Sequence, residues 1–512
     1  MIAISGIVAA YGPFDPLEGM RMLDRLTHRG PDGQGTQALD HAWLGHRRLA
    51  VVDLEGGAQP LRDPNGRYWL VGDGEIYNYE RLRHELEARG HTFRTRTDQE
   101  SALHLLEDEG TEALSRLWGM FAFAGATVDG RFFAARDTMG LAPLYWARQD
   151  GTVVFSSELK AFDPHRRPDV ELFPPGHVWS PQDGLTEFRP LPEVEPIAPT
   201  VANHEDPEPP EEVFATIRDR LIHAVERYTE ADVPVGALLS GGLDSSIVTA
   251  IAARHAQRKG RKFRTFAAGL VDSDDVLAAR EVAEALGTEH SERLYTNDEL
   301  IDWMPEVIRV IESFDPQLLH SSVPNLLVSK RAARDVKVVL LGEGADELFA
   351  GYSHYGEISG EAELHETLLS AIRDLHMGGL QRVDRVAGAT GLEPRTPFLD
   401  LDVVELGLSL PARWKLSSGG RPEKWLLRKA FDGWLPESVL WRPKAQFGQG
   451  TGSRDVLGEY YASTVSKEEF ENERYVLDPP LHSREELAYF RMFQRELKGV
   501  DPQRLVGRFE GW

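Results

Sequence analysis

An acidic, proline-dense stretch over residues 195–212, EPIAPTVANHEDPEPPEE, separates two parts of the sequence that have different patterns. This stretch has almost no large apolar side chains, so it cannot contribute to a core and is typical of a linker. The chain of 512 residues is long enough for roughly two to four domains, each with its own core. We therefore predict one domain over residues 1–194, a linker over 195–212 and a second domain over 213–512.

The first part is predicted to be rich in short strands. Its apolar and aromatic residues fall in brief runs separated by turn residues, with few long helical periods. The opening segment, residues 1–10, is apolar and lacks a basic start, which indicates a buried first strand rather than a leader. The other predicted strands include residues 69–71, 120–124, 131–135 and 153–157.

Strands and helices alternate in the second part. This alternation predicts an α/β domain with a doubly wound parallel sheet. From about residue 362 onward, the chain is predicted to be mostly helical. The predicted strands cover residues 233–239, 263–270 and 336–341, and the predicted helices between and before them cover 213–230, 246–258 and 274–286.

The composition excludes several classes of protein. The 57 basic and 82 acidic residues give a formal net charge of −25, so the phosphate backbones of nucleic acids gain little from this surface. The chain contains no cysteine, which excludes disulfides, thiolate metal sites and cysteine nucleophiles. Because a run of about 20 apolar residues is also missing, we expect no nucleic-acid partner, no membrane span and a cytoplasmic location.

The strand predicted over residues 233–239 leads into the string SGGLDSS and then into a helix. Backbone N–H groups and a helix N-terminus therefore meet at the carboxyl edge of the sheet, an arrangement that binds anions. The glycines let the backbone approach a phosphate, the serines donate hydrogen bonds, and Asp244 offers a hard oxygen ligand to Mg²⁺. A tight turn capped by Asp244 and Ser245 is the structural alternative. The residues predicted to bind ATP are Leu239, Ser240, Gly241, Gly242, Asp244, Ser245, Ser246 and Gly342.

The string SGGLDSS lacks a Walker lysine and resembles the pyrophosphate loop of ATP pyrophosphatases, which split ATP into AMP and pyrophosphate. A second motif, LGEGADELFAGY over residues 341–352, follows another hydrophobic strand and so reaches the same edge of the sheet. Three further motifs follow: GLEPRTPFLD over 391–400, EKWLLRKAF over 423–431 and RPKAQF over 442–447. In this order, the motifs resemble the synthetase domain of glutamine-dependent asparagine synthetases.

The first part resembles the class II glutamine amidotransferase domain of the same family. This resemblance implies an α+β domain, an antiparallel β-sandwich flanked by helices of the kind found in N-terminal nucleophile hydrolases. The motifs that carry it are HRGPD from His28, HRRL from His46, GEIYN from Gly74, the single residue Asp98, and SELK from Ser157.

The resemblance also implies a two-step reaction. A carboxylate, usually aspartate, attacks the α-phosphate of ATP, and ammonia then displaces AMP from the acyl-adenylate. Asp244 and Asp346 are expected to hold the Mg²⁺ ion that bridges the phosphates of ATP. Glu343 matches the proposed general base for the attacking amine, and Lys444 matches a lysine that stabilises negative charge on the adenylate and pyrophosphate.

The glutaminase half departs from the family pattern at two positions. The family begins MCGIxG, and matching Ile4 and Gly6 to this pattern places Ile2 where the nucleophilic cysteine belongs. Asp73 replaces an asparagine of the oxyanion hole, where a carboxylate repels an oxyanion. We therefore expect an inactive glutaminase site, which either keeps a glutamine-shaped pocket or is kept for its packing. The residues predicted to line that pocket are Arg48, Asp73, Gly74, Glu75 and Asp98.

The synthetase half departs from the pattern as well. Gln317 and His320 replace a threonine and an arginine near the adenylate, so the sequence leaves open which carboxylate is the substrate. Glu343 stands where β-lactam synthetases have a catalytic tyrosine, which favours an intermolecular ligase over a cyclase. Arg395 and Asp400 are expected to organise the pocket as an ion pair.

The leading hypothesis is an ATP-dependent, amide-forming ligase that takes ammonia or another amine. The alternatives are an amide ligase or cyclase of specialised metabolism, related to β-lactam synthetases, and a binding protein that has lost its activity. The second alternative is disfavoured because SGGLDSS, Glu343, Asp346 and Lys444 are all present. The expected partners are a small carboxylate, an amine or ammonia, glutamine if its pocket survives, and a second copy of the chain in a homodimer.

Overall fold

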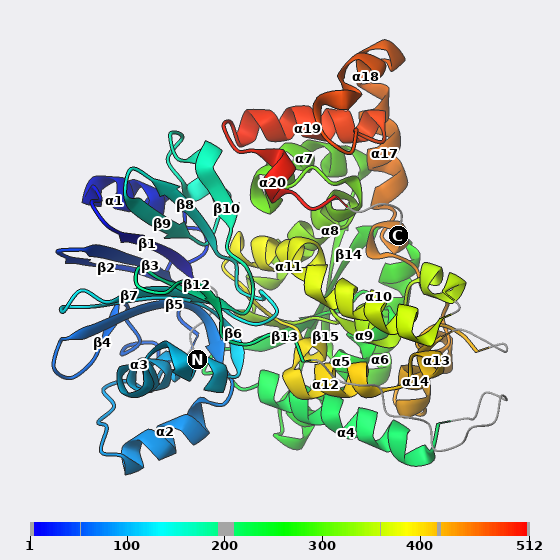
Figure 1. The fold of residues 1–512 in the computed structure, drawn as a ribbon. Helices are drawn as coiled ribbons and strands as arrows, with labels where there is room; N and C mark the ends of the chain where they lie inside the picture. Colours follow the sequence, from blue (N-terminus) through cyan, green and yellow to red (C-terminus); the bar gives the residue numbers. More distant parts are fainter. Residues whose placement is uncertain (1–4, 52, 193–208, 359, 417–420, 509–512) are drawn as a thin grey trace.

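The computed structural model describes residues 5–51, 53–192, 209–358, 360–416 and 421–508. Two layered parts lie side by side, and the strand-rich part comes first in the chain (Figure 1). Most of the predicted linker, residues 195–208, lies outside the described residues. Helix α4 begins at Glu211, inside the stretch predicted as linker.

The first part consists of two antiparallel sheets of six strands each. The first sheet has the order β10-β8-β9-β1-β3-β2 and the second has the order β12-β11-β7-β6-β5-β4. The strands of the first sheet are β1 (Gly6–Tyr11), β2 (Gly33–Leu39), β3 (Ala42–Arg48), β8 (Tyr145–Gln149), β9 (Thr152–Ser156) and β10 (Val170–Leu172). The strands of the second sheet are β4 (Leu61–Arg62), β5 (Tyr68–Ile76), β6 (Gly119–Thr127), β7 (Phe132–Arg136), β11 (His177–Ser180) and β12 (Gly184–Glu187).

The side chains of β1 show how this sandwich packs. Ile7 and Ala9 lie in a core with Val71 of β5, between the two sheets. Val8 and Ala10 point to the opposite face, because side chains alternate along a strand, and pack with Met22 of helix α1. Helices therefore flank a β-sandwich, as predicted. The flanking helices are α1 (Pro16–Asp24) on the first sheet and α3 (Asp98–Glu109), with α2 (Tyr79–Ala88) beside it, on the second.

The second part contains a parallel sheet of five strands in the order β15-β14-β13-β16-β17. The strands are β13 (Val235–Leu238), β14 (Arg264–Leu270), β15 (Glu289–Tyr295), β16 (Val338–Leu340) and β17 (Glu393–Arg395). The direction of winding changes between β13 and β16, and ligands bind at such switch points. The prediction of a doubly wound sheet is confirmed, although the polar edge strand β15 and the short β17 were not predicted.

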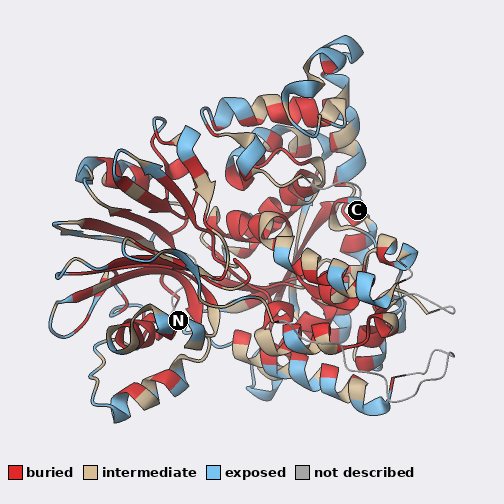
Figure 2. Ribbon diagram, in the orientation of Figure 1, coloured by how far each residue is buried: buried red, intermediate tan, exposed pale blue. Residues whose placement is uncertain are grey.

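Helices cover both faces of this sheet, and its strands other than the edge strand β15 are mostly buried, while the outer helix faces are exposed (Figure 2). The C-terminal part is mostly helical, as predicted. Within the described residues, no helix is long and apolar enough to cross a membrane. The helices are α4 (Glu211–Tyr228), α5 (Leu243–Arg258), α6 (Asp274–Leu286), α7 (Asn297–Ile311), α8 (Pro316–Ala332), α9 (Ala345–Phe349), α10 (Glu361–Asp374), α11 (Gly379–Gly388), α12 (Leu401–Ser409), α13 (Ala412–Lys415), α14 (Trp425–Ala430), α15 (Glu437–Leu440), α16 (Phe447–Gly450), α17 (Ser453–Ser463), α18 (Lys467–Glu473), α19 (Arg484–Glu496) and α20 (Pro502–Leu505).

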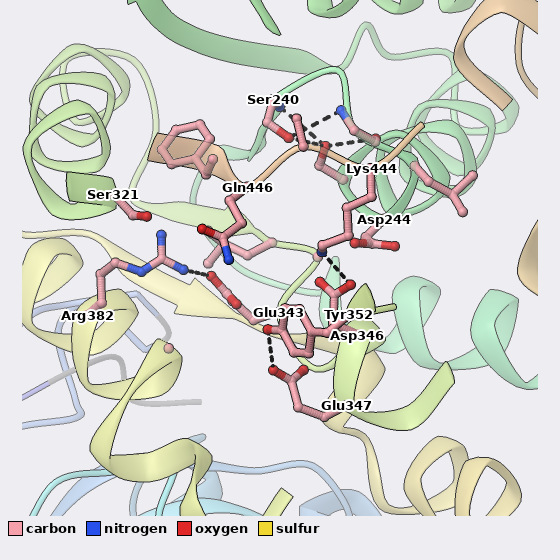
Figure 3. Close-up of a pocket in the computed structure, with 18 of the residues that line it drawn as sticks. Ser240, Asp244, Ser321, Glu343, Asp346, Glu347, Tyr352, Arg382, Lys444 and Gln446 are labelled. Carbon is pink, nitrogen blue, oxygen red and sulfur yellow. Dashed lines mark hydrogen bonds and ion pairs between the residues drawn. The ribbon is translucent and has the colours of Figure 1, made fainter. Parts of the chain in front are cut away.

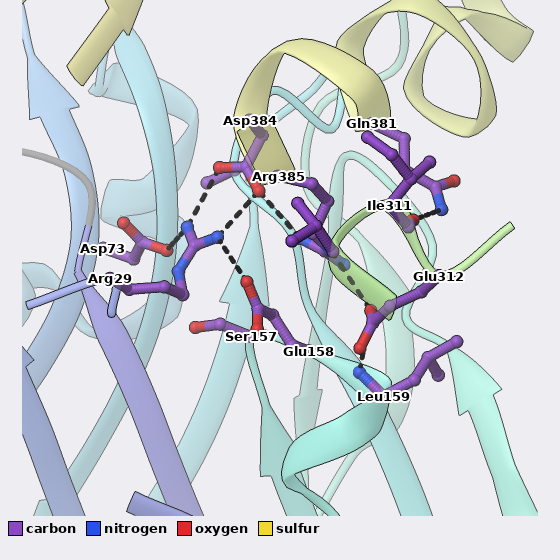
Figure 4. A network of polar contacts seen from close by, with 12 residues as sticks. Arg29, Asp73, Ser157, Glu158, Leu159, Ile311, Glu312, Gln381, Asp384 and Arg385 are labelled. Carbon is purple, nitrogen blue, oxygen red and sulfur yellow. Dashed lines mark hydrogen bonds and ion pairs between the residues drawn. The ribbon is translucent and has the colours of Figure 1, made fainter. Parts of the chain in front are cut away.

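A buried polar network joins the two parts (Figure 4). The guanidinium of Arg29 is fully buried and pairs with Asp73 at 2.9 Å and with Glu158 at 3.1 Å, both in the first part. It also donates to both oxygens of Asp384 on α11, at 2.8 and 2.9 Å. Because each buried charge has a partner of opposite sign, the network fixes how the two parts meet.

The next residue of α11 extends this network. Arg385 pairs with Glu312 at 3.2 Å and donates to the hydroxyl of Tyr145 at 3.1 Å. Glu312 follows α7 and accepts the backbone N–H groups of Leu159 and Lys160, at 3.1 and 2.7 Å. Buried hydrogen bonds thereby hold helix α11 against β8 directly, through Tyr145, and against the segment after β9 through Glu312.

We predict that Arg29→Met lowers the free energy of unfolding by about 3–5 kcal/mol, because it leaves the buried carboxylate of Asp73 without its cation and removes a shared cation from Glu158 and Asp384. Urea unfolding followed by tryptophan fluorescence measures this loss. The matched control is Arg21→Met, because Arg21 is half exposed and pairs with Asp163 at the surface. The control is expected to shift the unfolding midpoint little, and equal shifts in both variants would show that the buried network does not stabilise the contact.

Candidate active site

A cavity of about 470 Å³ lies at the switch point of the parallel sheet. The loops after β13 and β16 form its floor, and residues 442–447 close one side. Helices α8, α10 and α11 form the remaining walls. The close-up of the cavity shows charged side chains from several of these elements pointing toward one another (Figure 3).

The loop over residues 240–246 is tied together by its own serines. The hydroxyls of Ser240 and Ser245 lie 3.0 Å apart, and the backbone N–H of Gly242 donates to Ser240 Oγ at 3.3 Å. Gly241 has a φ of +73°, and a Cβ there would lie 2.6 Å from Ala278 Cβ on α6. The loop therefore needs glycine at this position for close packing against α6.

Six of the eight residues predicted to bind ATP line the cavity, and two do not. The backbone of Gly241 packs against α6, and Ser246 is fully buried inside α5. These two residues shape the loop rather than face the cavity. The six residues that line it are Leu239, Ser240, Gly242, Asp244, Ser245 and Gly342.

Gly342 brings the second loop against the first. A Cβ on Gly342 would lie 2.7 Å from the backbone nitrogen of Ser245 and 2.8 Å from Asp244 Cβ. Real Cβ atoms do not approach other atoms so closely, so only glycine allows the loop after β16 to touch the start of α5. This contact places Asp346, on α9, beside Asp244.

Two lysines form ion pairs with these carboxylates. Lys424 Nζ is 2.5 Å from Asp244 Oδ2 and 2.6 Å from Asp346 Oδ1, and Lys444 also pairs with Asp346 (Figure 3). Burial alone would raise the pKa of Asp346, but the two ammonium groups outweigh it and lower the pKa to about 2. Burial raises the pKa of Asp244, and Lys424 offsets part of that effect. The sequence analysis predicted Lys444 here and missed Lys424.

Lys424 carries one sequence signal that could have identified it. It lies in the motif EKWLLRKAF, directly before the apolar residues that begin α14. Its ion-pair partners are both distant in the sequence. Its side chain is 3% exposed, and its backbone has a φ of +55°, which is uncommon for a residue other than glycine. Such backbone conformations cluster at functional sites, where surrounding contacts enforce them.

Glu343, the predicted base, lies in the cavity and pairs with Arg382 of α11 (Figure 3). Glu347 is buried behind it and accepts a hydrogen bond of 2.8 Å from the hydroxyl of Tyr352. Burial raises the pKa of Glu347 to about 7. The sequence analysis singled out neither Glu347 nor Arg382, because the first lies next to a stronger candidate and the second is far away in the sequence.

Three expectations for the synthetase half have different outcomes. Gln317 lines the cavity, as expected. His320 does not: its imidazole lies 2.5 Å from Glu485 of α19. The predicted pair of Arg395 with Asp400 is wrong, since Arg395 pairs with Glu393 and, across the contact between the two parts, with Glu75. Asp400 instead caps α12.

Four of the five predicted glutamine-pocket residues are buried in the first part, and Arg48 is partly buried. Asp73 accepts the backbone N–H of Ser5 at 2.6 Å besides pairing with Arg29, so its carboxylate is fully engaged. Asp98 accepts the N–H of Ile76 at 2.7 Å, and Arg48 donates to the carbonyl oxygen of Asp53 at 2.7 Å. Ile2 lies outside the described residues.

Two of these residues face α11 instead of an open pocket. Asp73 and Gly74 line a small cavity of about 20 Å³ together with Leu380 and Asp384 of that helix. Glu75 is fully buried against Arg395. This side of the first part therefore forms the contact with the second part.

The fold and the site define a protein in which an amidotransferase-type β-sandwich is joined to an α/β domain of the ATP-pyrophosphatase type. The family models agree: a glutamine amidotransferase domain matches residues 1–175, and asparagine synthase matches residues 216–360 and 356–488. The chain belongs to the asparagine synthetase family.

Similar proteins span nearly the whole chain. Glutamine-hydrolysing asparagine synthetase 3 of Arabidopsis thaliana is 38% identical over 513 residues, which cover 95% of this chain and 86% of the plant protein. The Sandersonia aurantiaca glutamine-hydrolysing asparagine synthetase is 36% identical over 524 residues, covering 97% of each chain. Among solved structures, glutamine phosphoribosylpyrophosphate amidotransferase from B. subtilis is 23% identical, with a TM-score of 0.33, and covers 50% of this chain and 65% of its own.

We predict that Gly342→Ala weakens ATP binding by about 5-fold or more, because overpacking at a close backbone contact costs about 1–3 kcal/mol. Isothermal titration with MgATP measures the dissociation constant. Gly356→Ala is the matched control, since a Cβ on the exposed Gly356 would meet no atom within 4 Å. An unchanged dissociation constant for Gly342→Ala would show that the two loops can move apart without loss of affinity for ATP.

Proposed function

We propose that the chain joins a small carboxylate to ammonia or another primary amine, with cleavage of ATP to AMP and pyrophosphate. Membership of the asparagine synthetase family makes it an ATP-dependent carbon–nitrogen ligase. Aspartate is the first carboxylate to test, because the relatives are named as asparagine synthetases. In this proposal, residues 1–194 form the amidotransferase-like domain and residues 213–512 form the synthetase domain.

One observation carries this proposal: a phosphate-type loop, two carboxylates and two lysines meet in one cavity. Asp244, Asp346, Lys424 and Lys444 come from four separate segments of the chain, and all four line the cavity. Packing alone does not require four charges at one point whose side chains are only 3–21% exposed, and removing them from water costs free energy. A ligand that carries several negative charges and a divalent cation accounts for all four.

The residues present fit a Mg²⁺ ion. Asp244 and Asp346 offer the hard carboxylate oxygens that Mg²⁺ prefers, and Asp244 Oδ1 is buried without a hydrogen-bond partner among the described residues. A bound Mg²⁺ ion would neutralise charge on the phosphates of ATP. Ser240, Gly242 and Ser245 are positioned to donate hydrogen bonds to the same phosphates.

In the first step, a carboxylate oxygen of the substrate attacks the α-phosphorus of ATP, and the bond from that phosphorus to pyrophosphate breaks. Negative charge then moves onto the departing pyrophosphate. Lys444 lies over the ring of Tyr352 at 4.9 Å and reaches the carboxylate pair, so it is held in place rather than free in solvent. Its ammonium group stabilises the departing charge without reorganisation.

In the second step, the amine nitrogen attacks the acyl carbon, and the carbon–oxygen bond to AMP breaks. The attacking nitrogen must lose a proton, and Glu343 is the carboxylate placed to accept it. Arg382 pairs with Glu343 and holds its side chain against the wall of the cavity. Arg382 is therefore a positioning residue in this proposal.

We further propose that the first part no longer hydrolyses glutamine. Ile2 offers no nucleophile at the position of the family's cysteine. The carboxylate of Asp73 accepts from Arg29 and from the N–H of Ser5, so it offers an oxyanion a negative charge in place of a hydrogen-bond donor. The nitrogen must then come from ammonia or an amine in solution.

The proposed reaction predicts carboxylate-dependent release of pyrophosphate and AMP. Asp244→Asn is expected to lower this rate about 100-fold or more, because it weakens charge neutralisation worth several kcal/mol. A coupled pyrophosphate assay over a panel of carboxylates, starting with aspartate, measures the rate. Asp219→Asn, on the exposed face of α4, is the control and is expected to keep full activity. Release of ADP and phosphate would contradict the mechanism.

The proposed loss of glutaminase predicts that glutamine does not support amide formation, whereas ammonium chloride at alkaline pH or a primary amine does. The reason is that glutamine hydrolysis needs both a nucleophile and an oxyanion site, and the chain provides neither. Amide formation and glutamate release are measured in parallel by mass spectrometry. Glutamate release at a rate comparable to amide formation would overturn this part of the proposal.

A further inference from the structure

The cavity extends past Glu343 to one face of helix α10. Thr367, Ser370, Ala371 and Asp374 all line it, and their spacing of three to four residues places them on the same side of that helix. This face is small and polar up to Asp374, the last residue of α10. We call the space between this face and Glu343 the acceptor lobe.

Two consecutive glycines keep the acceptor lobe open beside Glu343. Gly378 and Gly379 precede and begin α11, and both line the cavity. A Cβ on Gly379 would lie 3.3 Å from Glu343 Oε2 and 3.4 Å from Leu375 Cδ1. A side chain at this position would therefore occupy the space between the proposed base and the lobe.

Asp374 has no cation to balance it. Its Oδ2 accepts a hydrogen bond of 3.2 Å from the hydroxyl of Ser370. Among the residues that the structure describes, no basic side chain forms an ion pair with it, whereas Asp244, Asp346 and Glu343 are each paired with a cation. Glu347 also forms no ion pair, but it is buried and accepts the hydroxyl of Tyr352. Asp374 thus leaves one uncompensated negative charge in the lobe.

The position of Asp374 on its helix makes this charge more unfavourable. The C-terminal end of a helix carries partial negative charge, so a carboxylate in the last turn is destabilised. Asp374 is the final residue of the 14-residue helix α10. Both the side chain and the end of the helix favour a bound cation in this part of the cavity.

We propose that the acceptor substrate is a primary amine that carries a second positively charged group, held by Asp374 while the attacking nitrogen lies beside Glu343. This inference rests on the proposed function and specifies its substrate class. A diamine is the simplest such molecule. Its free amino group attacks the acyl carbon, the bond to AMP breaks, the proton passes to Glu343, and the distal ammonium remains unreacted.

The test separates adenylation from acceptor use. Carboxylate-dependent exchange of pyrophosphate into ATP, with aspartate and then the carboxylate panel, requires no amine and reports the first step alone. Amide formation is then measured with ammonium, butylamine and 1,4-diaminobutane. The lack of any exchange would contradict the proposed function, and with it this proposal; exchange together with equal use of butylamine and the diamine would contradict this proposal alone.

For the unmodified chain, kcat/KM with 1,4-diaminobutane is expected to exceed that with butylamine at least about 10-fold, which corresponds to one ion pair of about 1.4 kcal/mol in a partly buried site. Asp374→Asn, which is close to the native residue in size, is expected to abolish this preference and to leave exchange and butylamine use unchanged. Glu366→Gln, on the exposed face of the same helix, is the matched control and is expected to keep the preference.

Two outcomes would show that Asp374 has another role. If Asp374→Asn weakens exchange with the carboxylate, the side chain binds the acyl donor instead. If it lowers activity with ammonium and the diamine equally, its role is structural. Gly379→Ala provides a second variant: it narrows the passage to the lobe, so it should reduce diamine use several-fold more than ammonium use, and an equal reduction would overturn the proposal.

Discussion

The arrangement of this molecule depends on the contact of two carboxylates, Asp244 and Asp346, which repel each other unless a cation lies between them. Lys424 provides that cation at 2.5 and 2.6 Å. The loop after β16 can therefore lie against the start of α5, and Gly342 allows the approach sterically. The same ion pairs fasten the segment that carries Lys424 over the edge of the sheet. The charges proposed to bind the nucleotide thus also hold the wall of the cavity together.

Helix α11 connects this site to the other half of the chain. Arg382 contacts Glu343 in the cavity, and two residues later Asp384 holds the buried Arg29 of the first part. Both contacts lie on one short helix, so the position of the proposed base is tied to the contact between the two parts. This gives a physical reason for the chain to keep an entire amidotransferase-like sandwich even if, as proposed, it no longer hydrolyses glutamine. The sandwich supplies Arg29, the buried cation that Asp384 of α11 shares with Asp73 and Glu158 of the first part.

The sequence predicted those features that depend on neighbouring residues. The strand–loop–helix at residues 240–246 and the alternating second part could be predicted because their signals are local. Features set by distant partners could not. Arg395 was assigned to Asp400, five residues away, but pairs with Glu75 across the molecule. Lys424 was missed because its two partners lie far from it in the sequence. The acceptor lobe was not predicted either, because it is an empty space. It exists where Gly378 and Gly379 have no side chain to fill it.

The acceptor lobe and the altered glutaminase site support the same view of nitrogen supply. Ammonia offers almost no surface for recognition, so an enzyme that takes it from solution has little binding energy with which to select it. A larger amine can use binding energy from parts that do not react, and a buried carboxylate that would otherwise stay unpaired discriminates strongly in its favour. Asp374 at the end of α10, which is partly buried and forms no ion pair among the described residues, is the group proposed for this role. If the amine enters the cavity from solution, as proposed, the cavity walls must distinguish it from other amines. The glycines beside Glu343 leave the space that such an amine would occupy.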